Sequence, residues 1–139
     1  GVRWGDHETT LTFIDTRSGL WTNAYYQYPL ANPPAADLDG VLRFGMDNKV
    51  KQRREREGLT DYTIRQSSIQ QSVVDGRPAL SWVADFTGKG PLHPAMTEYM
   101  LRYIGASGKA DVFTQVPATV DLNAFVERIQ PVIQSLRIP

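Results

Sequence analysis

Apolar and polar residues alternate most clearly between Tyr62 and Phe86, in the middle of the chain. In the later part of this stretch every second residue is apolar: Leu80, Trp82, Ala84 and Phe86. This alternation predicts a strand with one buried face. Asp75-Gly76 precedes that strand, and an Asp-Gly pair favours a tight hairpin turn because the turn residues need positive φ. The pattern therefore predicts two antiparallel strands, Tyr62–Val74 and Pro78–Phe86.

The first arm of this hairpin does not keep one alternation. Ile64 and Ile69 are an odd number of residues apart, so a regular strand would place them on opposite faces. An irregularity between them would restore a common face, and we expect a β-bulge near Ser67-Ser68.

Four further segments are predicted to be strands: 9–15, 20–28, 95–104 and 110–116. The second of them is rich in aromatic residues and ends before Pro29, which cannot join a sheet interior. Segment 95–104 fits helical spacing as well as alternation. Its short length and its position after Pro94 favour a strand.

Two segments carry apolar residues at helical spacing. The first follows Asp37, a favourable N-cap residue, and runs to Glu57. Its apolar stripe is Leu38, Val41, Leu42, Met46 and Val50. The second follows Asp121, with the stripe Leu122, Phe125, Val126, Ile129, Val132, Ile133 and Leu136. Pro131 lies inside the second segment and predicts a kink, or a short break, near Glu127-Arg128.

The predicted element order is β-β-α-β-β-β-β-α, with about six strands in one antiparallel sheet. Both helices have an apolar stripe that needs a sheet face to cover it, which predicts an α+β fold, an α-β-α sandwich. The 139 residues suit a single domain, 1–139, and the polar residues 1–8 are expected to form a loose N-terminal tail.

Composition narrows the function classes. The chain has no Cys, which removes disulfides, thiol nucleophiles and Cys-ligated zinc. Lys plus Arg and Asp plus Glu both number 15, and this balance makes a nucleic-acid partner unlikely. No apolar run approaches the ~18 residues of a membrane-spanning helix.

Three stretches resemble one known family. LRYIGASGKADVFTQVPA, DLNAFVERIQPVIQSLRIP and GLWTNAYYQYPL are similar to the late strand-turn-strand, the closing helix and the early strand of the PsbP-like group, which shares its fold with the nuclear-import factor Mog. The resemblance implies an α-β-α sandwich without an assigned activity. It also implies an exported bacterial protein, extracytoplasmic (periplasmic or secreted) and in some members lipid-anchored, while a cytoplasmic location stays open. Pro33-Pro34 stand where many members have a Trp.

The densest aromatic group is a candidate ligand-binding site. Alternation places Tyr26 and Tyr28 on one face of strand 20–28 and Trp21 and Tyr25 on the other. One pair is expected in the core. The other pair either lines a ligand groove together with the Pro-rich loop 29–36 or simply packs under that loop. His93, in a Gly- and Pro-rich loop, is a further candidate for ligand contact.

The one basic cluster lies at the end of the first helix, where it is a candidate partner-binding site for an anionic surface. Its members are Lys49, Lys51, Arg53, Arg54 and Arg56. Glu55 and Glu57 sit among them and reduce the net charge, so an ordinary solvated helix end is the competing interpretation.

No catalytic motif is present in the sequence. Thr87-Gly88-Lys89-Gly90 lacks the spacing of a phosphate-binding loop, and no serine lies in a nucleophile elbow. The two histidines, His7 and His93, are too few for a His-based zinc site, so no cofactor or metal is expected. A His93 general base beside Asp85 or Glu98 is the weakest of three hypotheses.

The sequence therefore predicts a non-enzymatic accessory or protein-interaction module. The alternative is a small-ligand-binding domain that uses the aromatic strand 20–28 and the Pro-rich loop 29–36. The two hypotheses differ in what they require of the structure. An interaction module needs an exposed surface, whereas a ligand site needs a deep pocket with converging polar groups.

Overall fold

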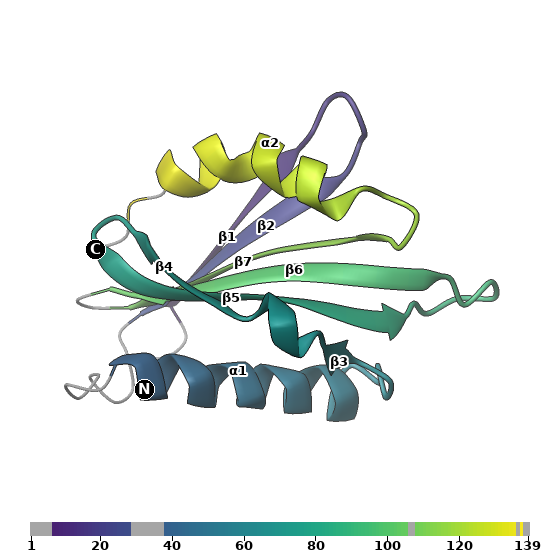
Figure 1. Ribbon diagram of the computed structural model, residues 1–139, viewed down its shortest axis with the longest axis horizontal. Helices are drawn as coiled ribbons and strands as arrows, with labels where there is room; N and C mark the ends of the chain where they lie inside the picture. The colour runs from purple at the N-terminus through teal and green to yellow at the C-terminus, as the bar shows by residue number, and fades with distance from the viewer. Residues whose placement is uncertain (1–6, 29–37, 106–107, 136, 138–139) are drawn as a thin grey trace.

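The computed structural model describes residues 7–28, 38–105, 108–135 and 137. Seven strands form one sheet, and the two helices lie on opposite sides of it (Figure 1). In chain order the elements are β1 (His7–Ile14), β2 (Trp21–Tyr28), α1 (Leu38–Glu55), β3 (Thr63–Ile64), the 3-10 turn η2 (Gln66–Ser68), β4 (Gln70–Val74), β5 (Arg77–Thr87), β6 (Ala95–Ile104), β7 (Lys109–Pro117) and α2 (Leu122–Ser135).

Every strand pairing in the sheet is antiparallel, with the order β1-β2-β7-β6-β5-β3, and β4 also pairs with β5. The predicted antiparallel sheet between two helices is thus confirmed, although its strands number seven and not about six. The extra strand arises because the first hairpin arm is split into β3 and β4. Segment 95–104 is a strand, β6. β1 begins at His7, inside the segment predicted to be a tail.

The hairpin at Asp75-Gly76 is confirmed. Both residues have positive φ, 52° and 69°, as a tight hairpin turn of this kind requires. Between β3 and β4 the expected irregularity is the 3-10 turn η2 and not a one-residue bulge. Ile64 pairs with Ala84 and Gln70 with Ser81, so six residues of one arm span three of the other. This odd offset returns Ile69 to the face of Ile64, and both pack in the core on the α1 side.

Alternation in the long strands sends side chains into two separate cores. The core under α1 contains Leu42, Met46, Tyr62, Leu80, Trp82, Phe86 and Met100. The core under α2 contains Tyr99, Leu101, Tyr103, Val112, Phe125, Ile129 and Ile133. Trp82 and Phe86 of the predicted hairpin are buried, and so are Phe125, Ile129 and Ile133 of the second helix stripe, while Val132 is partly buried. Trp82 and Phe86 nevertheless face α1, across the sheet from Phe125.

The two helices follow their predicted apolar stripes with small differences. Asp121 caps α2, because its carboxylate accepts a hydrogen bond from the backbone N–H of Ala124 at 3.2 Å. α2 continues through Pro131, so the short break predicted as an alternative to a kink near Glu127-Arg128 does not occur. α1 ends two residues before the predicted Glu57, and Val41 from its predicted stripe is 37% exposed. Asp37 lies outside the described residues. No helix among the described residues is long and apolar enough to cross a membrane.

Candidate functional site

The sheet face under α1 is only partly covered by that helix. α1 packs over β5 and β6, while β7, β2 and β1 extend beyond it. The strand register gives one cross-strand row on this face, Thr12, Asn23, Phe113, Met100 and Trp82, and a second row, Thr10, Tyr25, Asp111, Arg102 and Leu80. We call the part beyond α1 the open half-face. It consists of Thr10, Thr12, Ile14, Trp21, Asn23, Tyr25, Phe113 and Gln115.

The open half-face carries a pair of exposed apolar side chains. Ile14 and Trp21 are direct cross-strand partners, and they are 59% and 60% exposed. Tyr25 and Phe113 are half-buried beside them. The rim is uncharged and polar, and the Thr12 hydroxyl donates a hydrogen bond to Asn23 Oδ1 at 2.9 Å. An aromatic anchor within a polar rim is the usual composition of a protein-binding surface.

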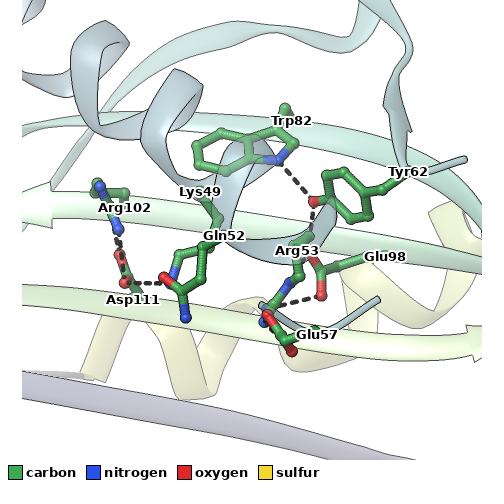
Figure 2. A network of polar contacts seen from close by, with 9 residues as sticks. All are labelled: Lys49, Gln52, Arg53, Glu57, Tyr62, Trp82, Glu98, Arg102 and Asp111. Atoms are coloured by element: carbon green, nitrogen blue, oxygen red, sulfur yellow. Dashed lines mark hydrogen bonds and ion pairs between the residues drawn. The ribbon is translucent and has the colours of Figure 1, made fainter. Parts of the chain in front are cut away.

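A buried polar network fastens the C-terminal half of α1 to the sheet (Figure 2). Its centre is Glu98 on β6, which is 0% exposed. The Glu98 carboxylate accepts hydrogen bonds from Arg53 Nη2 at 3.0 Å, from the Tyr62 hydroxyl at 2.6 Å and from Gln115 Nε2 at 2.6 Å. Arg53 Nη1 also donates to both oxygens of Glu57, at 2.9 and 2.7 Å. Each buried charge in this network therefore has a partner of opposite sign, as burial requires.

A second buried ion pair lies two rows away along the sheet, beyond the row of Met100 and Phe113. Arg102 donates two hydrogen bonds to Asp111, at 2.7 and 2.9 Å, in the bidentate geometry typical of Arg–carboxylate pairs. Lys49 Nζ from α1 lies 3.7 Å from the same carboxylate. α1 lies so close to the sheet here that a Cβ atom on Gly45 would clash with Arg102 Nη1. Position 45 therefore accommodates only glycine unless Arg102 moves.

Burial and neighbouring charges shift the pKa values of Asp111, Arg53 and Tyr62 in these networks. Burial alone would raise the pKa of Asp111, but Arg102 and Lys49 outweigh it and hold that pKa below its usual value. Burial would lower the pKa of Arg53, and Glu98 and Glu57 reverse this shift and raise it. Burial, and then the neighbouring Glu98 charge, raises the pKa of Tyr62, so its hydroxyl stays protonated and donates.

Both networks border the open half-face. The guanidinium of Arg53 lies over the Phe113 ring, 5.2 Å from its centroid. Gln115 belongs to the open half-face and also donates to Glu98. The open half-face is therefore supported from one side by side chains that are locked in ion pairs, which makes it a rigid surface.

Among the described residues, the aromatic side chains proposed for ligand binding lie on both faces of the sheet. Trp21 and Tyr25 lie on the open half-face, whereas Tyr26 faces the other way and packs against the core under α2. The side chain of Tyr28 and the loop 29–36 lie outside what the structure describes. The alternation that separated the two pairs is confirmed for Trp21, Tyr25 and Tyr26.

The basic cluster proposed for partner binding is not a single surface. Lys49 and Arg53 point toward the sheet, with side chains only 13% and 7% exposed, and both are paired with buried carboxylates. Arg54 is exposed and donates to the carbonyl oxygen of Tyr62 at 2.8 Å. Lys51 and Arg56 are exposed. The expectation that Arg53 lies at a solvated polar position is wrong, because Glu98 draws it inward.

His93 lies in a separate cleft of about 280 Å³, lined by Gly58, Thr60, Asp61, Thr87, Gly88, Lys89, Gly90 and His93. His93 is exposed and has a φ of 40°. The two carboxylates that the enzyme hypothesis placed beside it have other partners, since Asp85 binds Arg65 and Glu98 binds Arg53. No group of three or more His, Asp or Glu side chains in the described part of the chain is arranged to hold a metal ion.

Sequence reasoning missed the residues that organise this face, namely Ile14, Glu98, Arg102, Asp111 and Phe113. One signal was available for two of them. Glu98 and Arg102 share a strand face with Met96, Met100 and Ile104, and a charged residue on an apolar face is a candidate for buried pairing. Nothing in the sequence identifies their partners, which come from α1 and β7.

The comparisons with known proteins show the fold alone. No protein-family model matches the sequence, and no curated protein matches it. A crystal structure described as "Protein of Unknown Function PA94 from Pseudomonas aeruginosa, Putative Regulator" is similar, with a TM-score of 0.60 and 7% sequence identity. The alignment covers 96% of this chain and 83% of that chain.

Proposed function

We propose that this chain is a non-enzymatic protein-interaction module and that the open half-face is its binding surface. The observation that carries the proposal is the Ile14–Trp21 pair, which leaves more than half of the tryptophan side chain and of the isoleucine side chain exposed to water. Exposing such side chains is unfavourable by roughly 25 cal/mol per Å² of apolar surface, and a protein partner would remove that cost. Trp is also enriched among the residues that contribute most binding energy in interfaces.

Rigidity supports the same proposal. The residues beneath and beside the open half-face are fixed by the Arg53–Glu98 and Arg102–Asp111 pairs, whose side chains are at most 8% exposed. A surface that is already ordered loses less conformational entropy when a partner binds. The buried charges thus prepare the open half-face for binding and do not themselves contact the partner.

Small-ligand binding has a different observation in its favour. The cleft at Asp61, Lys89 and His93 is concave, although its volume of about 280 Å³ is at the lower limit of ligand pockets. The sequence placed this alternative at the aromatic strand 20–28 together with the Pro-rich loop 29–36, and that loop lies outside the described residues. We therefore place protein interaction first and keep small-ligand binding as the second candidate, at the cleft.

The PsbP-like relationship and the extracytoplasmic location are part of the proposal. The order of the elements, with one helix on each side of an antiparallel sheet, is what that resemblance implies. Whether the chain is exported is a separate question, which the location of a tagged full-length protein in bacterial cell fractions would answer.

Selection from a phage-displayed library of random dodecapeptides tests the proposed surface. The bait is the wild-type protein, and each enriched peptide is then synthesised and titrated by fluorescence anisotropy. We expect Trp21→Ala to weaken binding at least tenfold. Val73→Ala is the matched control, because Val73 is 62% exposed on β4, at the opposite edge of the sheet. Peptides that bind Trp21→Ala as tightly as wild type would refute the open half-face as the binding surface.

A further inference from the structure

The two edges of the sheet differ in how they are protected. The edge formed by β3 and β4 is interrupted by the turn η2, and β3 has only two residues. The edge formed by β1 is a regular run of eight residues, and it ends the sheet order among the described strands. Between Thr9 and Ile14 it contains no proline and no charged residue, which are the usual features that keep an edge strand from pairing.

The hydrogen-bond phase of β1 shows which backbone groups face outward. The N–H of Asp15 donates to the carbonyl of Leu20 at 2.9 Å, and these residues continue the β1–β2 register. Hydrogen-bonded pairs alternate along an antiparallel ladder, so Phe13 and Leu11 also bond to β2. The N–H and C=O groups of Ile14, Thr12 and Thr10 therefore point away from the sheet.

The outward-facing residues of β1 are the same residues that belong to the open half-face. A strand added at this edge would form its hydrogen-bonded pairs with Thr10, Thr12 and Ile14. Residues opposite each other in a pair have side chains on the same face. The side chains of the added strand opposite these three residues would therefore extend the open half-face, and the one opposite Ile14 would continue the row that begins with Trp21.

We propose that β1 receives an extended segment of a partner polypeptide as an added strand, with an apolar residue opposite Ile14. This inference rests on the proposed function, because it specifies how the partner meets the open half-face. The backbone contributes general affinity through hydrogen bonds to Thr10, Thr12 and Ile14. The side chains over the open half-face select the sequence of the partner.

The chemistry of β1 favours a different polypeptide over a second copy of this chain. Two copies of β1 paired about a twofold axis, in the two registers with the greatest overlap, would place Ile14 either opposite Glu8 of the other copy or beyond the end of its strand. Apolar side chains would then not meet, and an edge of eight residues alone buries less than the ~1,200 Å² of a stable interface. A heterologous segment avoids the first restriction, because it can present an apolar residue opposite Ile14.

Two variants at one position separate strand addition from simple surface contact. Thr12→Pro removes the outward N–H, and an edge strand tolerates proline where its N–H faces solvent. Thr12→Ala is the matched control, because both variants lose the Thr12–Asn23 hydrogen bond and only one loses the N–H. With a library-selected peptide, we expect Thr12→Pro to weaken binding about tenfold or more and Thr12→Ala to change it by less than about threefold.

A second measurement uses the unmodified protein, so it does not depend on how Thr12→Pro folds. The peptide is methylated at one backbone nitrogen at a time, and each derivative is titrated. Strand addition predicts that binding is lost at every second position across the central residues. Uniform tolerance, or a loss without this period of two, would overturn the added strand.

The outcomes separate this inference from the proposed function. If Trp21→Ala weakens binding while Thr12→Pro and N-methylation do not, the open half-face binds its partner without an added strand, and only this inference is wrong. If none of these changes matters, both are wrong. A dimer seen by light scattering in the wild type and lost in Thr12→Pro would identify a second copy as the occupant and overturn the heterologous segment.

Discussion

Replacing Glu98 by glutamine removes one charge from the centre of the buried network and changes almost nothing else in size. The carboxylate accepts hydrogen bonds from three side chains, those of Arg53, Tyr62 and Gln115. A glutamine offers one acceptor oxygen, and its amide N–H groups would face donors. Arg53 would keep Glu57, whose side chain is 37% exposed, as its only carboxylate partner in the described structure.

The expected loss follows from this geometry. Removing one partner of a buried ion pair costs about 3–5 kcal/mol, and the remaining Glu57 places Glu98→Gln near the lower limit, about 3 kcal/mol. A domain of this size has a free energy of unfolding of roughly 5–15 kcal/mol, so the variant should still fold. For this chain length the same loss corresponds to a decrease in Tm of about 10 °C.

Urea unfolding followed by far-UV circular dichroism measures this loss. The matched control is Asp85→Asn, which breaks a bidentate pair with Arg65 whose side chains are about half exposed, 48% and 52%. Exposed pairs contribute only about 0.2–1 kcal/mol. If Glu98→Gln costs no more than Asp85→Asn, then Glu98 is hydrated in solution, and our argument for a rigid support under the open half-face is wrong.

Three further predictions concern the packing and charge of the fold. Phe125→Ala should cost ~3–5 kcal/mol in urea unfolding, because Phe125 is 1% exposed under α2, and a loss below ~1 kcal/mol would place it in solvent. Gly45→Ala should lower the free energy of unfolding by about 2 kcal/mol or more, because displacing the buried Arg102 guanidinium outweighs the ~1 kcal/mol gained in helix propensity. A variant more stable than wild type would contradict the close approach of α1 to Arg102. Burial would raise the pKa of Asp111, but Arg102 and Lys49 outweigh this effect and lower the pKa in the folded state. The stability that Asp111 contributes is therefore present above the ordinary pKa of ~3.9, and it is lost as the pH falls through the folded pKa. Urea unfolding between about pH 6 and pH 2 should therefore show a smaller acid-induced loss for Asp111→Asn than for wild type.

Features determined by neighbours in sequence were predictable. The Asp75-Gly76 turn follows from backbone conformation at two residues, and α2 follows from a stripe of apolar residues at helical spacing. The mismatch between Ile64 and Ile69 correctly indicated an irregularity. Its form was not predictable, because a bulge and a 3-10 turn both restore the common face.

The candidate site depended on contacts that sequence does not reveal. Arg53 looked like one of five solvated cations at a helix end, and only its pairing with Glu98, 45 residues away, draws it inward. The open half-face exists because β2 pairs with β7, while α1 packs over β5 and β6 and leaves the strands beyond them uncovered. Alternation correctly put Trp21 and Tyr25 on one face, but which face is left uncovered depends on this strand order.

Residue-resolved amide hydrogen exchange at β1 tests the central claim most directly. In the free protein we expect fast exchange at Thr10, Thr12 and Ile14, whose N–H groups face outward, and slow exchange at Leu11 and Phe13, which bond to β2. A library-selected peptide should then slow exchange at Thr10, Thr12 and Ile14. Saturating peptide that leaves these three amides in fast exchange would contradict binding at the β1 edge of the open half-face.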